Sequence, residues 1–276
     1  MKTSRTIWTA NRLLVQLLNN MAVIIKTAEE IELLREGGKR LATILAKVAT
    51  HVRPGVSSFE LDRIAEELIR DGGDEPAFKG YKPAMHMRPF PASLCVSVNN
   101  EIVHGIPSQE VILKEGDIVS LDLGLKHKGL FTDHAITVAV GKISKKDEEL
   151  LQRTKESLMV GIEAAKGGNR VGDIGFAIQQ YVKPFGYGIV KDLSGHGVGR
   201  AIHEDPYIPN YGKAGKGELL QPGMVIAIEP MLNIGSEHTV VARDGYTVRT
   251  SDGTRSAHFE HTVLITDGEP EILTLP

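Results

Sequence analysis

The sequence is poor in cysteine, in long apolar runs and in net charge, and each shortage excludes a class of protein. Cys95 is the only cysteine among 276 residues, so an internal disulfide framework is excluded and a reducing compartment such as the cytoplasm is favoured. No apolar run approaches the about 20 residues that a membrane-spanning helix needs. The net charge of −3 offers no basic footprint for nucleic acid. We therefore expect neither a membrane nor a nucleic acid as partner.

Residues 1–20 differ from the rest because they contain no acidic residue. Arg12 interrupts their apolar part and no small-residue cleavage site follows, which argues against a secretory signal. The acid-poor composition leaves an organellar transit peptide as an alternative. We expect a poorly ordered extension at 1–20 in front of a single catalytic domain at 21–276, with Met21–Ala22 as its natural beginning.

Capping signals and apolar spacing predict two pairs of helices, each pair followed by strands. The first, second and third helices begin with capping patterns, and the third runs to about Lys166. The fourth ends near Pro184, which cannot continue a helix. Strand patterns occupy 92–140 and about 224–275. The expected helix starts are Thr27, Ser57, Ser144 and Asp173.

An internal repeat supports this twofold order. Leu113–Asp122 aligns without gaps on Leu220–Glu229, and in both segments a glycine follows the leucine by three residues and an acid closes an apolar strand. Two similar αα-β halves, roughly 21–140 and 141–276, most simply pack about a pseudo-twofold axis with sheets side by side and helices outside. We therefore expect an α+β fold in which equivalent strands point at one central site.

Two aspartates lie in the predicted hairpin of the first half. A turn centred between His127 and Lys128 would make Asp122 and Asp133 direct cross-strand partners, with Cβ atoms roughly 4.5–5.5 Å apart. Like charges directly opposite each other are destabilising, and a buried carboxylate is costly unless it is paired or binds a metal. The hairpin therefore predicts a cation between the two aspartates.

The second half adds two acids and two histidines in similar settings. Glu229 and Glu260 each lie within an apolar strand pattern, and His196 and His203 lie in a glycine-rich segment whose backbone can approach a ligand. A single glutamate in an apolar strand is usually a surface residue or a paired structural one. Four acids in such settings beside a glycine-flanked histidine favour a functional site instead.

The donor types indicate which metal such a site would hold. Four carboxylates and one imidazole are hard, oxygen-rich donors that suit Mn²⁺, Fe²⁺ or Co²⁺, whereas a structural zinc site favours thiolates. Four negative charges exceed what one divalent ion neutralises. Two ions about 3.5–4 Å apart would balance them and generate a hydroxide nucleophile. We therefore expect two divalent ions, of Co, Mn, Fe or Zn, and metal-assisted hydrolysis.

Six motifs carry a more specific resemblance. They are Val103-His-Gly-Ile-Pro107, the hairpin with its two aspartates, Gly195-His-Gly-Val-Gly199, His203-Glu204, Ile228-Glu-Pro230 and Phe259-Glu-His-Thr262. Together they resemble the type I methionine aminopeptidases of the bacterial kind, in the pita-bread metallopeptidase family, over about Met21 to Leu275. The resemblance implies a curved antiparallel sheet with helices outside. It also implies that two-metal activated water removes the initiator methionine from nascent chains whose second residue is small.

The resemblance further implies roles for single residues. Asp133 and Glu260 would bridge two metal ions, and Glu229 would also take the proton from the bridging water. His104 would contact the scissile amide and His203 its carbonyl, although either could be a structural histidine bonded to backbone. Three histidines beside ligands, His134, His258 and His261, would support the ligands rather than act in catalysis. The full implied ligand set is Asp122, Asp133, His196, Glu229 and Glu260.

Four residues match family positions around the substrate's methionine side chain. They are Tyr81, Phe90, Cys95 and Tyr246, and aromatic faces with a thiol suit a thioether. Tyr246 stands where a tryptophan is common in the family. The link Lys82–Pro89 is longer than usual, so Lys82, His86 and Arg88 could meet substrate, solvent or a partner.

Three alternatives share parts of this pattern. Xaa-Pro aminopeptidases and prolidases have the same ligands but usually add an N-terminal domain, for which this chain has no room. Type II methionine enzymes insert a subdomain where this chain has only residues 204–228. A non-catalytic binding protein of this fold would have lost ligands, and none is missing here. We expect a monomeric enzyme acting on nascent polypeptide N-termini, with the ribosome exit region as a further contact.

Overall fold

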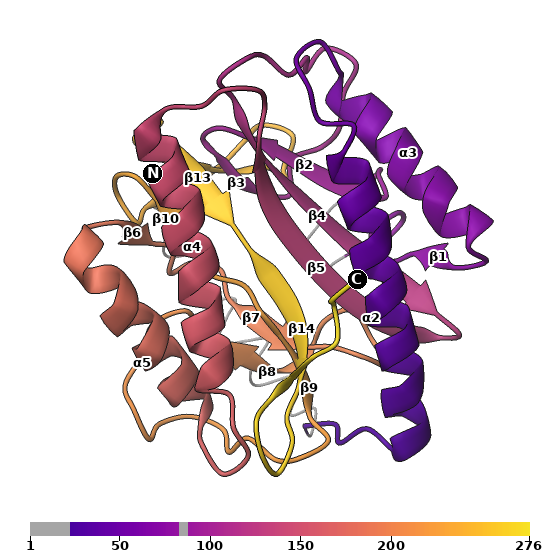
Figure 1. The fold of residues 1–276 in the computed structure, drawn as a ribbon, viewed down its shortest axis with the longest axis vertical. Helices are drawn as coiled ribbons and strands as arrows, with labels where there is room; N and C mark the ends of the chain where they lie inside the picture. The colour runs from indigo at the N-terminus through magenta and orange to yellow at the C-terminus, as the bar shows by residue number, and fades with distance from the viewer. Residues whose placement is uncertain (1–22, 83–87) are drawn as a thin grey trace.

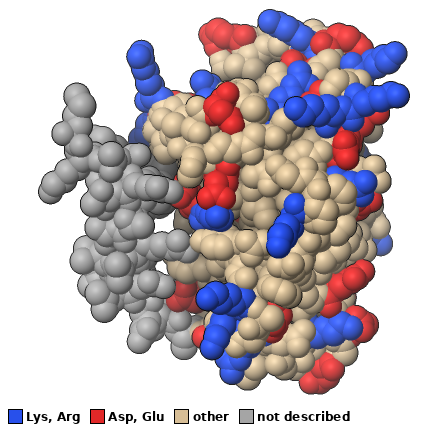
Figure 2. Space-filling model, turned by 90° about the vertical axis from the view of Figure 1, so that its left-hand side faces the viewer, with Lys and Arg blue, Asp and Glu red and all other residues tan. Residues whose placement is uncertain are grey.

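The computed structural model describes residues 23–82 and 88–276. The predicted extension at 1–20, the proposed start at Met21–Ala22 and His86 lie outside the described residues. Within these two ranges, no helix combines the length and apolar character of a membrane span. Figure 2 shows one face of the molecule, on which acidic and basic side chains of the described residues are interspersed, in keeping with the small net charge.

The helices begin close to the predicted capping residues. Thr27 forms a capping box with Glu30, and the side chains of Ser57 and Ser144 accept N–H groups from the first turns of their helices. The fourth helix starts earlier than predicted, because Arg170 is its N-cap residue and the Asp173 carboxylate accepts the Arg170 N–H at 2.7 Å. The helices are α2 (Ala28–Ala49), α3 (Ser58–Asp71), α4 (Lys145–Glu163), α5 (Val171–Val182) and the short η1 (Lys183–Phe185).

The strands form one large antiparallel sheet and two small ones. The large sheet has the order β1-β4-β5-β14-β9-β7-β8, with β2 on β4 and β15 on β14. Its strands are β1 (Glu75–Pro76), β2 (Leu94–Val98), β4 (Ile118–His127), β5 (Leu130–Ala139), β7 (Gly195–Gly197), β8 (Glu204–Ile208), β9 (Val225–Ile228), β14 (Glu260–Leu264) and β15 (Glu271–Ile272). The small sheets are β13-β10-β6 (Ser256–His258, Met231–Asn233, Gly188–Ile189) and β11-β12-β3 (Thr239–Val241, Val248–Thr250, Glu101–Val103).

The two predicted halves lie side by side. In Figure 1, α2 and α3 flank the strands of the first half, α4 and α5 those of the second. Strands β5 and β14 meet at the seam, where Ala135 pairs with Glu260. The α+β architecture with an antiparallel sheet is therefore confirmed.

The internal repeat extends to individual hydrogen bonds. Gly116 and Gly223 have positive φ angles of 89° and 88°. The Gly116 N–H donates to Val140 O, and the Gly223 N–H donates to Ile265 O, each at 2.9 Å. The repeated sequence therefore builds the same turn in both halves, directly before the strands that lead to Asp122 and Glu229.

The predicted register of the hairpin is wrong by two residues. Asp122 pairs with Ala135, and Asp133 pairs with Gly124, so the aspartates are diagonal neighbours on one face rather than direct partners. The turn is a two-residue loop of Lys128 and Gly129, both with positive φ. Such a loop needs a positive φ at both positions, which Gly129 adopts without strain, whereas a turn one residue earlier would require it of His127 and Lys128.

The helices and the site occupy opposite faces of the sheet. A Cβ on Gly37 of α2 would lie 3.1 Å from His127 and 3.8 Å from Thr132, so these residues face the helices. Because side chains alternate along a strand, Asp133 points to the other face. The apolar residues on the helix side form two large buried clusters, one under each helix pair.

Candidate metal and substrate site

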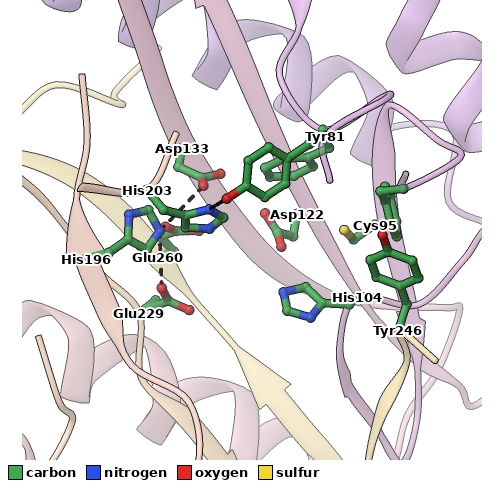
Figure 3. A pocket seen from close by; sticks show the side chains of 12 residues that line it. Tyr81, Cys95, His104, Asp122, Asp133, His196, His203, Glu229, Tyr246 and Glu260 are labelled. Carbon is green, nitrogen blue, oxygen red and sulfur yellow. Dashed lines mark hydrogen bonds and ion pairs between the residues drawn. The ribbon is translucent and has the colours of Figure 1, made fainter. Parts of the chain in front are cut away.

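Five neighbouring strands place the predicted ligands around one pocket. Asp122 lies on β4, Asp133 on β5, Glu260 on β14, His196 on β7, and Glu229 directly after β9. All five line the pocket in Figure 3, together with the six other predicted site residues. The structure therefore brings every predicted site residue to one place, whereas their roles stay predictions.

Strand register explains how the acids converge. Cys95 pairs with Asp122, Asp122 with Ala135, and Ala135 with Glu260, which sets four residues in a row across four strands. Directly paired residues point to the same face. The small Ala135 side chain at the centre of this row leaves a hollow between two carboxylates. Glu229 follows Ile228, the last paired residue of β9 beside β14, and so comes next to Glu260.

The acids of the cluster are buried, and some of their carboxylate oxygens have no hydrogen-bond partner among the described residues. Asp122, Asp133 and Glu260 are at most 8% exposed. Among the described residues, Asp122 Oδ1 and Glu260 Oε1 have no hydrogen-bond partner. Buried carboxylate oxygens without partners cost free energy, so the cluster is stable in its ionised form only with a cation.

Burial also raises the pKa values of the acids, because it disfavours the charged form of a carboxyl group. Burial raises the pKa of Asp122 and of Glu229 to about 7 each. Burial, followed by the charges of neighbouring acids, raises the pKa of Asp133 and of Glu260 well above the ordinary carboxyl value. Without a cation these carboxyls therefore hold protons to unusually high pH.

His196 is oriented to bind a metal. Its Nδ1–H donates to Gly197 O at 2.8 Å, since a carbonyl can only accept. Nε2 then carries the lone pair and lies 3.6 Å from Glu229 Oε1 and 3.9 Å from Asp133 Oδ2. Ligand atoms of Asp133, His196 and Glu260 lie within 4.8 Å of one another. Such an imidazole, fixed by a backbone carbonyl and facing carboxylates, fits a divalent cation.

The two predicted catalytic histidines flank this cluster. His203 is exposed at the pocket mouth, where its ring contacts that of His196 edge-on with centroids 4.4 Å apart. Tyr81, predicted as a pocket wall, shares a hydrogen bond of 2.8 Å with His203 Nδ1. His104 follows β3 and adopts a positive φ of 58°, a conformation uncommon for residues other than glycine.

An apolar pocket adjoins the acids. Phe90 and Tyr246 pack edge-to-face with ring centroids 5.2 Å apart, and both belong to a buried cluster with Cys95. Phe78 also lines the pocket. The sequence prediction missed Phe78, although this aromatic residue precedes Tyr81 by only three positions. The cavity that these residues share with the acids and histidines has a volume of about 110 Å³, enough for several waters, since one water needs about 10–15 Å³.

Only part of the long link Lys82–Pro89 can be placed, because 83–87 lie outside the described residues. Arg88 donates to Asp244 O at 2.9 Å, and the Tyr246 hydroxyl donates to Arg88 O. Arg88 therefore packs against the segment that carries the pocket wall.

The histidines beside the ligands separate into two groups. His258 Nε2 lies 3.6 Å from Glu229 Oε2, and neither ring nitrogen of His258 has a hydrogen-bond partner in the described part of the chain. His134 and His261 stack on each other with centroids 4.6 Å apart. Because they neighbour Asp133 and Glu260 in sequence, they point to the opposite face of the sheet.

Comparison with known proteins agrees with this geometry. Residues 32–267 match the model of metallopeptidase family M24. The chain is 49% identical over 253 residues to a methionine aminopeptidase from Clostridium perfringens, covering 92% of this chain and 99% of that protein. The structure of a methionine aminopeptidase from Thermotoga maritima superposes with a TM-score of 0.89 at 44% identity, over 92% of this chain and 100% of that one.

A prolidase from Pyrococcus furiosus is more distant. It superposes with a TM-score of 0.74 at 28% identity, and the match covers 92% of this chain but only 66% of the prolidase. About a third of the prolidase thus lies outside the match, in keeping with the expectation that prolidases have an additional domain.

Proposed function

The chain belongs to metallopeptidase family M24, as one of its methionine aminopeptidases, and from this membership we propose how its residues remove an N-terminal methionine. The observation that carries the proposal is the adjacency of two environments. Cys95 of the apolar pocket pairs directly with Asp122 of the acidic cluster. A methionine side chain in that pocket would therefore hold its own peptide bond beside the carboxylates.

The acidic cluster would hold two divalent ions. Four carboxylates and His196 carry more negative charge than one divalent ion balances, and their oxygen-rich chemistry suits Mn, Fe, Co or Zn with His196 as the nitrogen ligand. Ions bound there would polarise the scissile carbonyl and lower the pKa of a water molecule. Asp133 and Glu260, the most central acids, would bridge, with Asp122 on one side and Glu229 with His196 on the other.

The remaining steps belong to the chain's own residues. Glu229, at the edge of the cluster, accepts the proton from the water as its oxygen adds to the carbonyl carbon. His203 donates a hydrogen bond to the carbonyl oxygen and His104 contacts the amide. The carbon–nitrogen bond then breaks, and the proton taken by Glu229 passes to the leaving amine, which releases free methionine and the shortened chain.

The cellular setting rests on the substrate. We propose nascent polypeptide N-termini as substrates, which implies action in the cytoplasm by a single catalytic unit spanning residues 21–276. The ribosome exit region as a contact and the monomeric state stay predictions from the sequence. Nothing in the arrangement of the site calls for nucleic acid.

Peptide hydrolysis tests the proposal. Protein purified without added metal is given Mn²⁺ or Co²⁺ and offered Met-Ala-Ser, Met-Lys-Ser or an Ala-Pro peptide. We expect methionine release from Met-Ala-Ser, little from Met-Lys-Ser and no cleavage of Ala-Pro. Cleavage of Ala-Pro with Met-Ala-Ser intact would instead assign a proline-specific peptidase, and no cleavage of any peptide would favour a binding protein.

A further inference from the structure

A buried ion pair joins the segment before α2 to the residue that follows His203. Lys26 Nζ lies 2.6 Å from Glu204 Oε2, and each side chain is only 1% exposed. The two residues are 178 positions apart in the chain. They thus connect the beginning of the first half to the loop of the second half that carries His203.

Both partners of this ion pair are fixed from more than one direction. The Lys26 N–H donates to Gly223 O at 2.8 Å, in the repeated turn before β9. Glu204 Oε1 accepts the Ala201 N–H at 2.8 Å, inside the His203 loop. The lysine chain crosses so close to Gly199 that a Cβ there would lie 2.2 Å from Lys26 Cε. The loop from Gly199 to Glu204 therefore packs around the side chain of Lys26, whose backbone is bound to Gly223 outside the loop.

Stability alone does not account for this ion pair. Desolvation of two charges offsets most of their attraction, so a buried pair is often no more stabilising than apolar residues of similar size. The same loop has a second ion pair, Arg200 with Glu30 at 2.6 Å, but Arg200 is half exposed and such pairs contribute little. What the buried pair adds is a fixed position for the backbone at Glu204.

His203 is the residue that this position affects most directly. It precedes Glu204, and its ring is held from the other side by the Tyr81 hydroxyl. The hydrogen bond to Tyr81 fixes only one end of the His203 ring. If the backbone at His203 and Glu204 moved, the ring would therefore change its orientation. We propose that the Lys26–Glu204 ion pair is a positioning device that fixes His203 against the substrate carbonyl. This inference rests on the proposed function, because His203 acts on substrate only there.

A double-mutant cycle tests the inference. Lys26→Met should lower kcat on Met-Ala-Ser about tenfold, the scale of losing an outer support of a catalytic group. KM and metal content should stay as in the wild type, because Lys26 contacts neither the substrate nor the four acids of the proposed metal cluster. In the His203→Ala background, Lys26→Met should change kcat by less than about twofold, since coupled residues are not additive.

A second variant keeps the test decisive if Lys26→Met alone does not fold. Lys26→Met/Glu204→Gln leaves no uncompensated buried charge, and the amide oxygen can still accept the Ala201 N–H. It should fold, bind metal as the wild type does, and keep the lowered kcat. The matched control is Lys166→Met, which breaks an exposed Lys–Glu pair of 2.5 Å and should leave kcat unchanged.

Three results would overturn the inference. A wild-type kcat in the Lys26→Met/Glu204→Gln variant would show that the ion pair is dispensable for the chemistry. Equal losses from Lys26→Met with and without His203 would assign Lys26 a merely structural role. A wild-type protein that releases no methionine, with any of the metals, would remove the proposed function itself and the inference with it.

Discussion

The two halves of the molecule start from the same turn and then diverge. After Gly116, β4 runs for ten residues and returns through a tight loop into β5. After Gly223, β9 runs for only four residues, and four other strands, β10 to β13, come before its partner β14. The first half thus supplies two acids from one hairpin, whereas the second supplies Glu229 and Glu260 from strands far apart in the chain.

The neighbouring strands differ in the same way. In the first half, β2 places Cys95 beside Asp122. In the second, β7 places His196 opposite Ala227, two residues before Glu229. The equivalent edge therefore presents the thiol of Cys95 in one half and the imidazole of His196, the proposed nitrogen ligand, in the other. The repeated segment carries Asp122 and Glu229, whereas His196 and Tyr246 lie in parts of the second half that differ from the first.

Loss of the central acid should have the largest effect. Asp133→Ala removes a carboxylate that faces both halves, so turnover on Met-Ala-Ser should fall more than about 10²-fold, the scale of removing one electrostatic catalytic group. Bound metal should fall as well. The exposed Asp267 offers a control, Asp267→Ala, with unchanged activity. A fully active Asp133→Ala protein with its metal content intact would refute the ligand assignment.

Loss of a first-half histidine should separate chemistry from metal binding. His104→Ala should lower kcat about 10²-fold, within the range for general acid–base groups, while metal content measured on the purified protein stays near wild type. If metal were lost together with activity, His104 would have to be reassigned to the structure of the metal site.

The acids of the site show how much of it could be predicted from the sequence. Each acid was recognisable because it interrupts an apolar strand pattern. The alignment of Leu113–Asp122 on Leu220–Glu229 also identified, from the sequence alone, the equivalent strands of the two halves. The register of the hairpin was not predictable in this way. The turn is centred between Lys128 and Gly129 rather than one residue earlier, and this shift moves the cross-strand partner of Asp122 by two residues, from Asp133 to Ala135.

Long-range contacts were equally hidden. Lys26 and Glu204 are ordinary surface residue types, and only folding removes both from water. The orientation of the three neighbouring histidines, by contrast, follows from side-chain alternation along a strand. His134 and His261 lie one position from Asp133 and Glu260 and face the helices, whereas His258 lies two positions from Glu260 and faces Glu229.

Filling the hollow between the halves should weaken metal binding. Ala135 separates Asp122 from Glu260 at the seam, and Ala135→Val adds two methyl groups there. We expect metal affinity, measured by calorimetry, to fall about tenfold, with a stability cost of about 1–3 kcal/mol for overpacking. Ala139→Val, on the same face at the partly exposed end of β5, is the control. Unchanged affinity in Ala135→Val would place the metal away from this row.

The equivalent acids of the two halves should make the metal-free protein pH-sensitive. Burial raises the pKa of Asp122 and of Glu229 to about 7, so between pH 4 and 7 the folded chain binds more protons than the unfolded one. Its stability should therefore fall as pH rises through this window. Thermal unfolding should show the gain in Tm from Mn²⁺ growing from pH 5 to pH 7. A gain that shrinks over this range would contradict the metal site.

The repeated turn offers the smallest and most direct comparison. Gly116→Ala should cost about 1–2 kcal/mol for a positive φ, because its Cβ would meet only Lys142 O at 3.8 Å. Gly223→Ala should cost more, since its Cβ would lie 2.8 Å from Ile25. Chemical denaturation measures both, with Gly55→Ala at an open position of φ 88° as the reference. Equal costs for the two turns would mean that Ile25 moves freely.

The number of divalent ions bound per chain tests the central claim most directly. Metal-free wild-type protein, titrated with Mn²⁺ and followed by calorimetry and by methionine release from Met-Ala-Ser, should bind two ions, with full activity at saturation. Asp122→Ala and Glu229→Ala, one from each half, should each weaken the binding of one ion more than the other. A protein that binds no divalent ion at this pocket, yet releases methionine, would contradict the account.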